Sequence, residues 1–154
     1  ALKTQVWDPG FTDLYAVGLA SATLYLVDRP DEAEYLAKRM AEHQESDGSL
    51  KKATTSITSS RGQSLYLETT AVGALAWLRD PRDRFVPQAE GAVRYILQQC
   101  QGGRFGSTQA TVLSLKALLA YQRKTREARA QSPLRVELFV DPAAAATAGG
   151  EAAE

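Results

Sequence analysis

The sequence predicts an all-α protein in which about five helices alternate between an inner and an outer layer, as in part of an α/α toroid. One observation is that helices apolar on nearly all sides alternate with helices that carry a single apolar stripe. The other is a repeat: Gln44–Ser49 and Gln98–Ser107, about 54 residues apart, both end a helix with glutamine and a glycine-containing turn, which is typical of stacked helical hairpins. A short β-strand is predicted after the last helix.

Composition limits the class of protein. The 154 residues are enough for one domain, with 44% hydrophobic and 23% charged residues. Eighteen basic residues balance eighteen acidic ones, so we expect no nucleic-acid or anionic-membrane partner. The longest apolar run, at residues 16–27, is too short to span a bilayer, and no signal peptide is recognisable. The start at Ala1-Leu2-Lys3 is expected of an excised piece or a mature product.

The first inner helix is predicted over about residues 13–28. Thr12 or Asp13 is expected to cap its first turn, and Pro30 to stop it. Apolar residues lie on almost every side of this helix, which predicts burial on most sides.

Asp31 is expected to cap the first outer helix, over about residues 32–45. One stripe of this helix is apolar and the opposite face is charged, so we expect one packed side. Residues 46–64, rich in Ser, Thr, Lys and Gly, predict a long loop with a short extended piece at Thr55–Thr58.

The second hairpin repeats this pattern. Leu65–Leu78 is apolar nearly all round and ends before Asp80-Pro81, and Pro87 suits the start of the next helix. A single stripe predicts that this second helix is an outer one. The stripe consists of Val86, Ala89, Val93, Ile96, Leu97 and Cys100. A cysteine in that position is expected to be a small, inert hydrophobic residue.

The third inner helix is predicted from a cap at Ser107 or Thr108 to about Lys124. The glycines at 102–106 are expected to supply positive φ between two helices. A basic run then predicts a solvated helix end; it consists of Arg123, Lys124, Arg126 and Arg129.

Beyond this helix the pattern changes. Leu134–Val140 alternates apolar and polar residues, as a half-buried strand does. We therefore divide the chain into a helical part at 1–131, a β segment at 132–141, and an Ala/Gly/Glu-rich tail or linker at 142–154.

Several of these segments have a counterpart in a known family. Phe105–Thr111, followed by Leu115–Gln122, resembles the end of the thioester-containing domain of α2-macroglobulins and complement C3. Glu68–Leu78 and Arg94–Gln98 fit the preceding helices of that domain, and Thr58–Ser64 is more similar to the bacterial macroglobulins.

The resemblance extends over residues 12 to about 125 and implies the C-terminal part of a thioester-domain toroid. It also implies that the β segment at 132–141 begins a CUB-like domain. The residues that carry the structural motif are Glu68, Gly103, Gly106, Ser107, Thr108 and Gln109.

The sequence departs from this family at the residues that carry its chemistry. The family's thioester forms in a Cys-x-Glu-Gln motif, whereas Cys100 is followed by Gln101–Gly103. We therefore assign no catalytic, cofactor-binding or metal-binding residue. His43 is expected to be a solvated surface histidine, and Glu68 and Gln109 to hydrogen-bond loop backbone rather than act as catalysts.

The predicted function is that of a scaffold in a macroglobulin-like protein that traps proteases or tags targets covalently. The resemblance implies a secreted or periplasmic location, a non-enzymatic role without cofactors, protease partners for the parent protein, and contacts with neighbouring CUB-like and macroglobulin-like domains.

Two other classes remain open. A toroid enzyme of the terpene cyclase or prenyltransferase type would need an acidic Asp-x-Asp-Asp motif or zinc ligands, which this chain lacks. A protein-binding module would use the loop at 46–64; its expected partner surface consists of Ser46, Lys51, Lys52 and Arg61. Half a toroid would also expose apolar surface, so we expect the chain to self-associate.

Overall fold

The computed structural model describes residues 5–54 and 56–131. Within these residues the chain forms five α-helices and no strand, which confirms the all-α class. The predicted strand at 134–140 and the tail lie outside the described residues. In the part of the chain that is described, no helix is both long and apolar enough to cross a bilayer. The helices are α2 (Leu14–Leu26), α3 (Pro30–Ala41), α4 (Gly62–Leu78), α5 (Val86–Gln98) and α6 (Thr108–Gln131).

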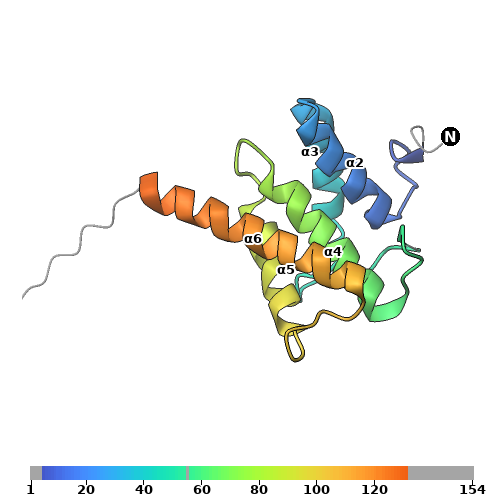
Figure 1. The fold of residues 1–154 in the computed structure, drawn as a ribbon. Helices are drawn as coiled ribbons and strands as arrows, with labels where there is room; N and C mark the ends of the chain where they lie inside the picture. The colour runs from blue at the N-terminus through green and yellow to red at the C-terminus, as the bar shows by residue number, and fades with distance from the viewer. Residues whose placement is uncertain (1–4, 55, 132–154) are drawn as a thin grey trace, which may run out of the picture.

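The helices form two layers around α4 (Figure 1). As an inner helix, α4 packs against α2 on one side and α6 on the other. The two outer helices complete the hairpins, because α3 packs against α2 and α5 packs against α4. This alternation of inner and outer helices is the predicted arrangement of part of an α/α toroid.

The core is centred on α4, most of whose residues are buried. Trp77 near its end has only 1% of its surface exposed, and its indole Nε1 donates a hydrogen bond of 3.1 Å to the Ala37 carbonyl of α3. Leu36 and Met40 of α3 are fully buried in the same cluster. A buried tryptophan contributes a large apolar area, and the hydrogen bond satisfies its polar atom, so Trp77 fixes α3 against α4.

The turn after α3 lies directly on α5. Gly48 has φ +87°, and a Cβ added to it would lie 2.1 Å from the carbonyl oxygen of Gly91 in α5. The Gln44 side chain donates hydrogen bonds of 2.9 Å to the carbonyls of Gly48 and Gln88. The glutamine and glycine of the first repeated turn therefore join α3 to α5.

A charged cluster closes the end of α4. The Arg84 guanidinium donates two hydrogen bonds to Asp80, of 3.1 and 2.6 Å, and the Arg84 backbone amide donates a third, of 2.9 Å. The guanidinium also forms an ion pair with Glu34 of α3. Burial raises the pKa of the Asp80 carboxyl, but hydrogen bonds from Arg84 outweigh this effect and hold the pKa below its ordinary value. Burial and the Asp80 carboxylate together raise the pKa of Tyr25, which donates to Asp80 at 3.3 Å.

Several helix ends differ from the prediction. Asp13 caps α2 as expected, accepting from two backbone amides. Asp31 was expected to cap α3, but this is wrong: Pro30 is the first helical residue, so Asp31 lies in the first turn, where its charge suits the helix dipole. α6 continues past Lys124 to Gln131, because nothing in this stretch breaks a helix.

Candidate functional site

The loop between α5 and α6 is a tight turn formed by glycines. Gln101 and Arg104 exchange two backbone hydrogen bonds, of 2.9 and 3.0 Å, across Gly102 and Gly103. Both glycines have positive φ, +56° and +78°, and Gly106 has φ +82°. The predicted role of the glycines is confirmed, since side chains disfavour these backbone conformations.

Glu68 of α4 receives the end of this loop. One carboxylate oxygen, Oε1, accepts hydrogen bonds from the hydroxyls of Ser60, at 2.6 Å, and Ser107, at 3.0 Å. Glu68 is fully buried, although a buried carboxylate is costly unless it is hydrogen-bonded. Its other oxygen, Oε2, has no partner among the described residues. The carboxylate thus joins α4 to the loops that precede α4 and α6.

Ser107 makes three contacts at this junction. Its Oγ donates to Glu68 and accepts from the backbone amide of Ala110 at 3.1 Å, so Ser107 caps α6. Its own backbone amide donates to Ser64 Oγ at 3.2 Å. A Cβ added to Gly106 would lie 2.9 Å from the same Ser64 oxygen. The glycine therefore lets the loop approach α4 closely enough to form these bonds.

We call Glu68, Ser60, Ser64 and Ser107 the carboxylate–serine cluster. Sequence reasoning singled out two of its members, Glu68 and Ser107, but expected Glu68 to bond loop backbone, which is wrong: its partners are hydroxyls. Gln109 makes no side-chain hydrogen bond within the described residues. Ser60 and Ser64 lie in the segment Thr58–Ser64 that carries part of the resemblance, but their roles in the cluster follow from no sequence pattern, because they depend on how this segment packs against α6.

A row of hydroxyls leads outward from the cluster. Thr58 Oγ1 lies 3.1 Å from the hydroxyls of both Ser56 and Ser60, and Thr58 is exposed. Ser60 next to a carboxylate is only part of a nucleophilic site, which also needs a base aligned on the hydroxyl and a third orienting group. His43 does not supply the base here, because its Nδ1 lies 3.3 Å from Lys52 Nζ. The cluster therefore fits a structural junction.

Metal ligation has no geometric basis in residues 5–54 and 56–131. No group of three His, Cys, Asp or Glu side chains there is placed to hold an ion. Cys100 also differs from its prediction: it follows the end of α5 and is exposed, so it is not part of a buried stripe. Leu97, predicted on the same stripe, is exposed as well, at 55%.

The expected partner surface is exposed at all four positions, Ser46, Lys51, Lys52 and Arg61. Lys51 forms an ion pair of 3.0 Å with Asp47, and Lys52 contacts His43. Burial raises the Asp47 pKa, but hydrogen bonds from Ser49 and Lys51 outweigh it and lower the pKa. These lysines are thus partly engaged within the chain, and a role in partner binding stays a prediction.

Comparison with known families gives a match over most of the chain. The A-macroglobulin TED domain family matches residues 3–121. No curated protein and no solved structure is significantly similar to the chain. The matched residues contain the carboxylate–serine cluster and the glycine loop, and the match ends within α6.

Proposed function

The chain belongs to the A-macroglobulin TED domain family, and we propose that it is scaffold in a macroglobulin-like protein that traps proteases or tags targets covalently. Domains of this family generally occur in non-enzymatic inhibitor and complement proteins. In this proposal the chain itself is not an enzyme and binds no cofactor. Its parent works outside the cytoplasm, secreted or periplasmic, where it meets proteases.

The observation that carries the proposal is the carboxylate–serine cluster. Glu68 and Ser107 both lie in segments that resemble the thioester domain. Ser107 Oγ donates a hydrogen bond of 3.0 Å to Glu68 Oε1, although the two residues are 39 positions apart in sequence. The bond holds the start of α6 against α4. Such a junction between inner helices stabilises a toroid without taking part in chemistry, as expected of scaffold.

The covalent step belongs elsewhere in the parent. A thioester needs a cysteine and a glutamine in the Cys-x-Glu-Gln order, and Cys100 lacks that context. Cys100 is also exposed, whereas an acyl group that must survive in water needs shielding. The chain would therefore help to house the thioester and connect it to a following domain.

The test uses a parent protein that contains this sequence. Its intact mass and free thiols are measured before and after treatment with methylamine. If the parent has a thioester, the methylamine nitrogen bonds to the acyl carbon of the glutamine side chain, the carbon–sulfur bond breaks, and the cysteine sulfur takes up the amine proton. The intact mass then rises by one methylamine, and one new cysteine thiol reacts in the titration.

Because Cys100 is exposed, its thiol should react with the thiol reagent both before and after methylamine treatment. A Cys100→Ser parent is the matched control: it should have one free thiol fewer before treatment and gain the same number of thiols on treatment. No mass gain and no new thiol would remove covalent tagging from the proposal.

The remaining part of the proposal is protease trapping. The parent is incubated with a protease, and activity is assayed on a small peptide substrate and on a large protein substrate. A trapped protease keeps its activity on the small substrate and loses it on the large one. If the protease with the parent keeps the full activity of the free protease on both substrates, the proposed inhibitory scaffold is contradicted.

A further inference from the structure

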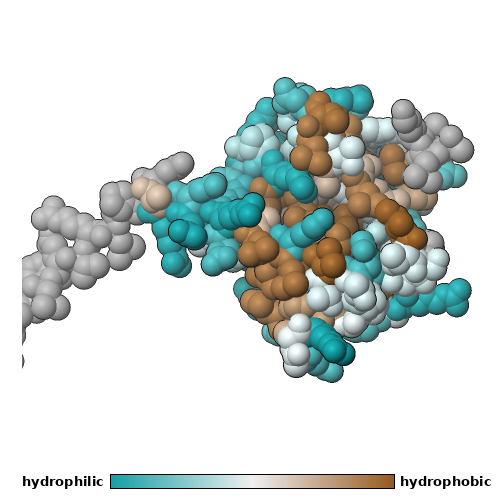
Figure 2. All heavy atoms as spheres, in the orientation of Figure 1, coloured by the Kyte–Doolittle hydropathy of each residue, from teal (hydrophilic) through white to brown (hydrophobic). Residues whose placement is uncertain are grey.

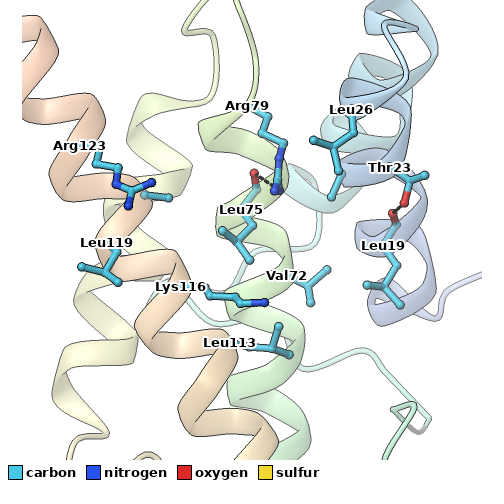
Figure 3. Close-up of a pocket in the computed structure, with 12 residues that line it drawn as sticks. Leu19, Thr23, Leu26, Val72, Leu75, Arg79, Leu113, Lys116, Leu119 and Arg123 are labelled. Atoms are coloured by element: carbon cyan, nitrogen blue, oxygen red, sulfur yellow. Dashed lines mark hydrogen bonds between the residues drawn. The ribbon is translucent and has the colours of Figure 1, made fainter.

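Cationic side chains are spread over the surface, so charge alone does not single out a site. Lys116 is an example, because it lines a groove between α2 and α6 together with Arg79 and Arg123 (Figure 3). Figure 2 shows apolar surface interrupted by hydrophilic atoms on this face of the molecule. In a toroid, further inner helices cover this side of the inner layer, so its cations need no ligand of their own.

Lys52 differs from these cations because it contacts the only histidine of the sequence. Its Nζ lies 3.3 Å from Nδ1 of His43. An ammonium group can only donate a hydrogen bond, so Nδ1 accepts, and the other ring nitrogen, Nε2, carries the proton of the neutral imidazole. The contact therefore places a base directly beside an amine.

Both residues of this pair are held in place by their backbones. The Lys52 carbonyl accepts a hydrogen bond of 2.7 Å from the amide of Leu14, the first residue of α2. The His43 amide donates to the Met40 carbonyl at 3.0 Å, just after the end of α3. Because two segments fixed on the bundle carry the amine and the base, less entropy is lost when the two groups meet.

The neighbouring lysine is in the opposite environment. Lys51 Nζ forms an ion pair of 3.0 Å with Asp47, and the hydrogen bond to this carboxylate raises the Lys51 pKa. Asp47 therefore keeps Lys51 as an ammonium ion, which has no lone pair with which to attack. Lys52 is exposed and has no ion pair within residues 5–54 and 56–131. The two adjacent lysines thus differ in their partner, a carboxylate for Lys51 and an imidazole for Lys52.

We propose that Lys52 is a site of acylation by small activated acyl groups, such as thioesters, with His43 as its general base. The neutral Lys52 amine attacks the acyl carbon and forms a carbon–nitrogen bond. His43 Nδ1 takes up the proton that the nitrogen loses, the carbon–sulfur bond breaks, and the leaving thiolate receives that proton. The products are a neutral amide on Lys52, a free thiol and a neutral His43, so acylation removes one positive charge from this loop.

Two other roles fit the pair less well. A metal ion would need at least three ligands, and the described residues form no His, Cys, Asp or Glu group of that size. An anionic partner would recognise Lys52 through its charge alone, and an imidazole that accepts the lysine's hydrogen bond adds nothing to that recognition. Acylation is the role that uses both the amine and the base.

The test measures acylation of the 154-residue chain by phenyl thioacetate. A Cys100→Ser chain is used throughout, because the exposed Cys100 thiol would itself attack the thioester. After cleavage with a glutamate-specific protease, mass spectrometry gives the initial rate at each lysine, and peptide fragmentation separates Lys51 from Lys52. Lys116, exposed and without an ion pair in the described part of the chain, is the matched reference. We expect Lys52 to react about tenfold faster than Lys116, and Lys51 to react more slowly than Lys116.

Variants separate a base from a mere hydrogen-bond acceptor. His43→Gln keeps an acceptor near Lys52 but cannot take up a proton, so the Lys52 rate should fall to about that of Lys116. Asp47→Asn removes the charge that holds Lys51 as an ammonium ion, and should raise the Lys51 rate about threefold while leaving the Lys52 rate unchanged. Circular dichroism checks that each variant keeps its helices.

Three results would overturn the assignment. The first is equal rates at Lys52 and Lys116. The second is an unchanged Lys52 rate in a folded His43→Gln chain. The third is release of thiophenol without an amide on Lys52, which would make His43 the nucleophile and water the final acceptor of the acyl group. None of these readouts depends on a thioester in the parent or on a protease, so the inference is tested separately from the proposed function.

Discussion

Replacing Gly106 by alanine tests the junction between the glycine loop and α4. The change adds a methyl group at a residue with φ +82°, and that methyl would lie 2.9 Å from Ser64 Oγ. The oxygen must move to avoid it, which breaks its hydrogen bond from the Ser107 amide. Gly103 is the matched control, because it has φ +78° in the same loop and nothing lies within 4 Å of its added Cβ.

Both replacements strain the backbone at a positive φ, but only Gly106→Ala also breaks a hydrogen bond. Alanine in the left-handed region costs about 1–2 kcal/mol, of which the restricted unfolded chain offsets about 0.4–1 kcal/mol. Gly103→Ala should therefore lower the free energy of unfolding by about 0.5–1 kcal/mol. Gly106→Ala should also lose a hydrogen bond worth about 1 kcal/mol, so its total cost should be about 1.5–2 kcal/mol.

Urea unfolding of the 154-residue chain, followed by the helical circular dichroism signal, measures both values. A double-mutant cycle then isolates the contact with Ser64. In a Ser64→Ala background the nearest atoms to the new methyl are the Cα and Cβ of residue 64 at 3.9 Å, an ordinary contact. Gly106→Ala should there cost no more than Gly103→Ala, which gives a coupling of about 1 kcal/mol.

Equal destabilisation by Gly103→Ala and Gly106→Ala would contradict the close contact with Ser64. An equal cost of Gly106→Ala with and without the Ser64 hydroxyl would contradict it too. Either result would mean that backbone conformation alone accounts for the glycine, and that the loop does not depend on its close approach to α4.

Three further outcomes follow from the geometry. Gly48→Ala should lower the free energy of unfolding by at least about 3 kcal/mol, because the added Cβ would lie 2.1 Å from the Gly91 carbonyl oxygen. Gly91→Ala should be close to neutral, because the atom nearest to its added Cβ is the Gln44 side-chain nitrogen at 3.4 Å. Thermal unfolding that ranks the two variants in the other order would contradict this packing. The pKa of Asp80 is lowered in the folded state, so its contribution to stability is present above about pH 4 and is lost as the pH falls through the folded-state pKa. Asp80→Asn should therefore lower the stability at neutral pH. It should also flatten the acid side of a plot of the urea unfolding midpoint against pH. Cys100 should react fully with a thiol reagent in the folded chain, and a requirement for denaturant would show that it is buried.

Periodicity was a good guide to the layers of the fold but a poor one to the ends of helices. The stripe that correctly placed Ala89, Val93 and Ile96 in the core was extended to Cys100, beyond the end of α5. Spacing identifies a face only while the helix lasts, and the turn that ends α5 sends Cys100 into solvent. α6 was predicted too short because a basic run was interpreted as an end, although lysine and arginine are good helix formers.

The carboxylate–serine cluster was predictable in part. Glu68 and Ser107 each stand at a recognisable place, near the start of an inner helix, yet their contact spans 39 residues of sequence. Only the packing of α4 against α6 brings them together. Half a toroid was expected to expose apolar surface, but the side of the inner helices that is left uncovered was not predictable, because a helix that is apolar on all sides does not reveal it.

The length of α6 has a mechanical consequence. Its 24 residues span about 36 Å, held at one end by the bond from Ser107 to Glu68 and farther along by Lys124, which donates to the carbonyls of Leu78 and Asp80. Residues 126–130 are exposed and project clear of the other helices (Figure 1). The helix is thus a lever with its fulcrum near Lys124. A pull on the end beyond Lys124 would load the Lys124 hydrogen bonds first and then the bond from Ser107 to Glu68 at the opposite end of the helix.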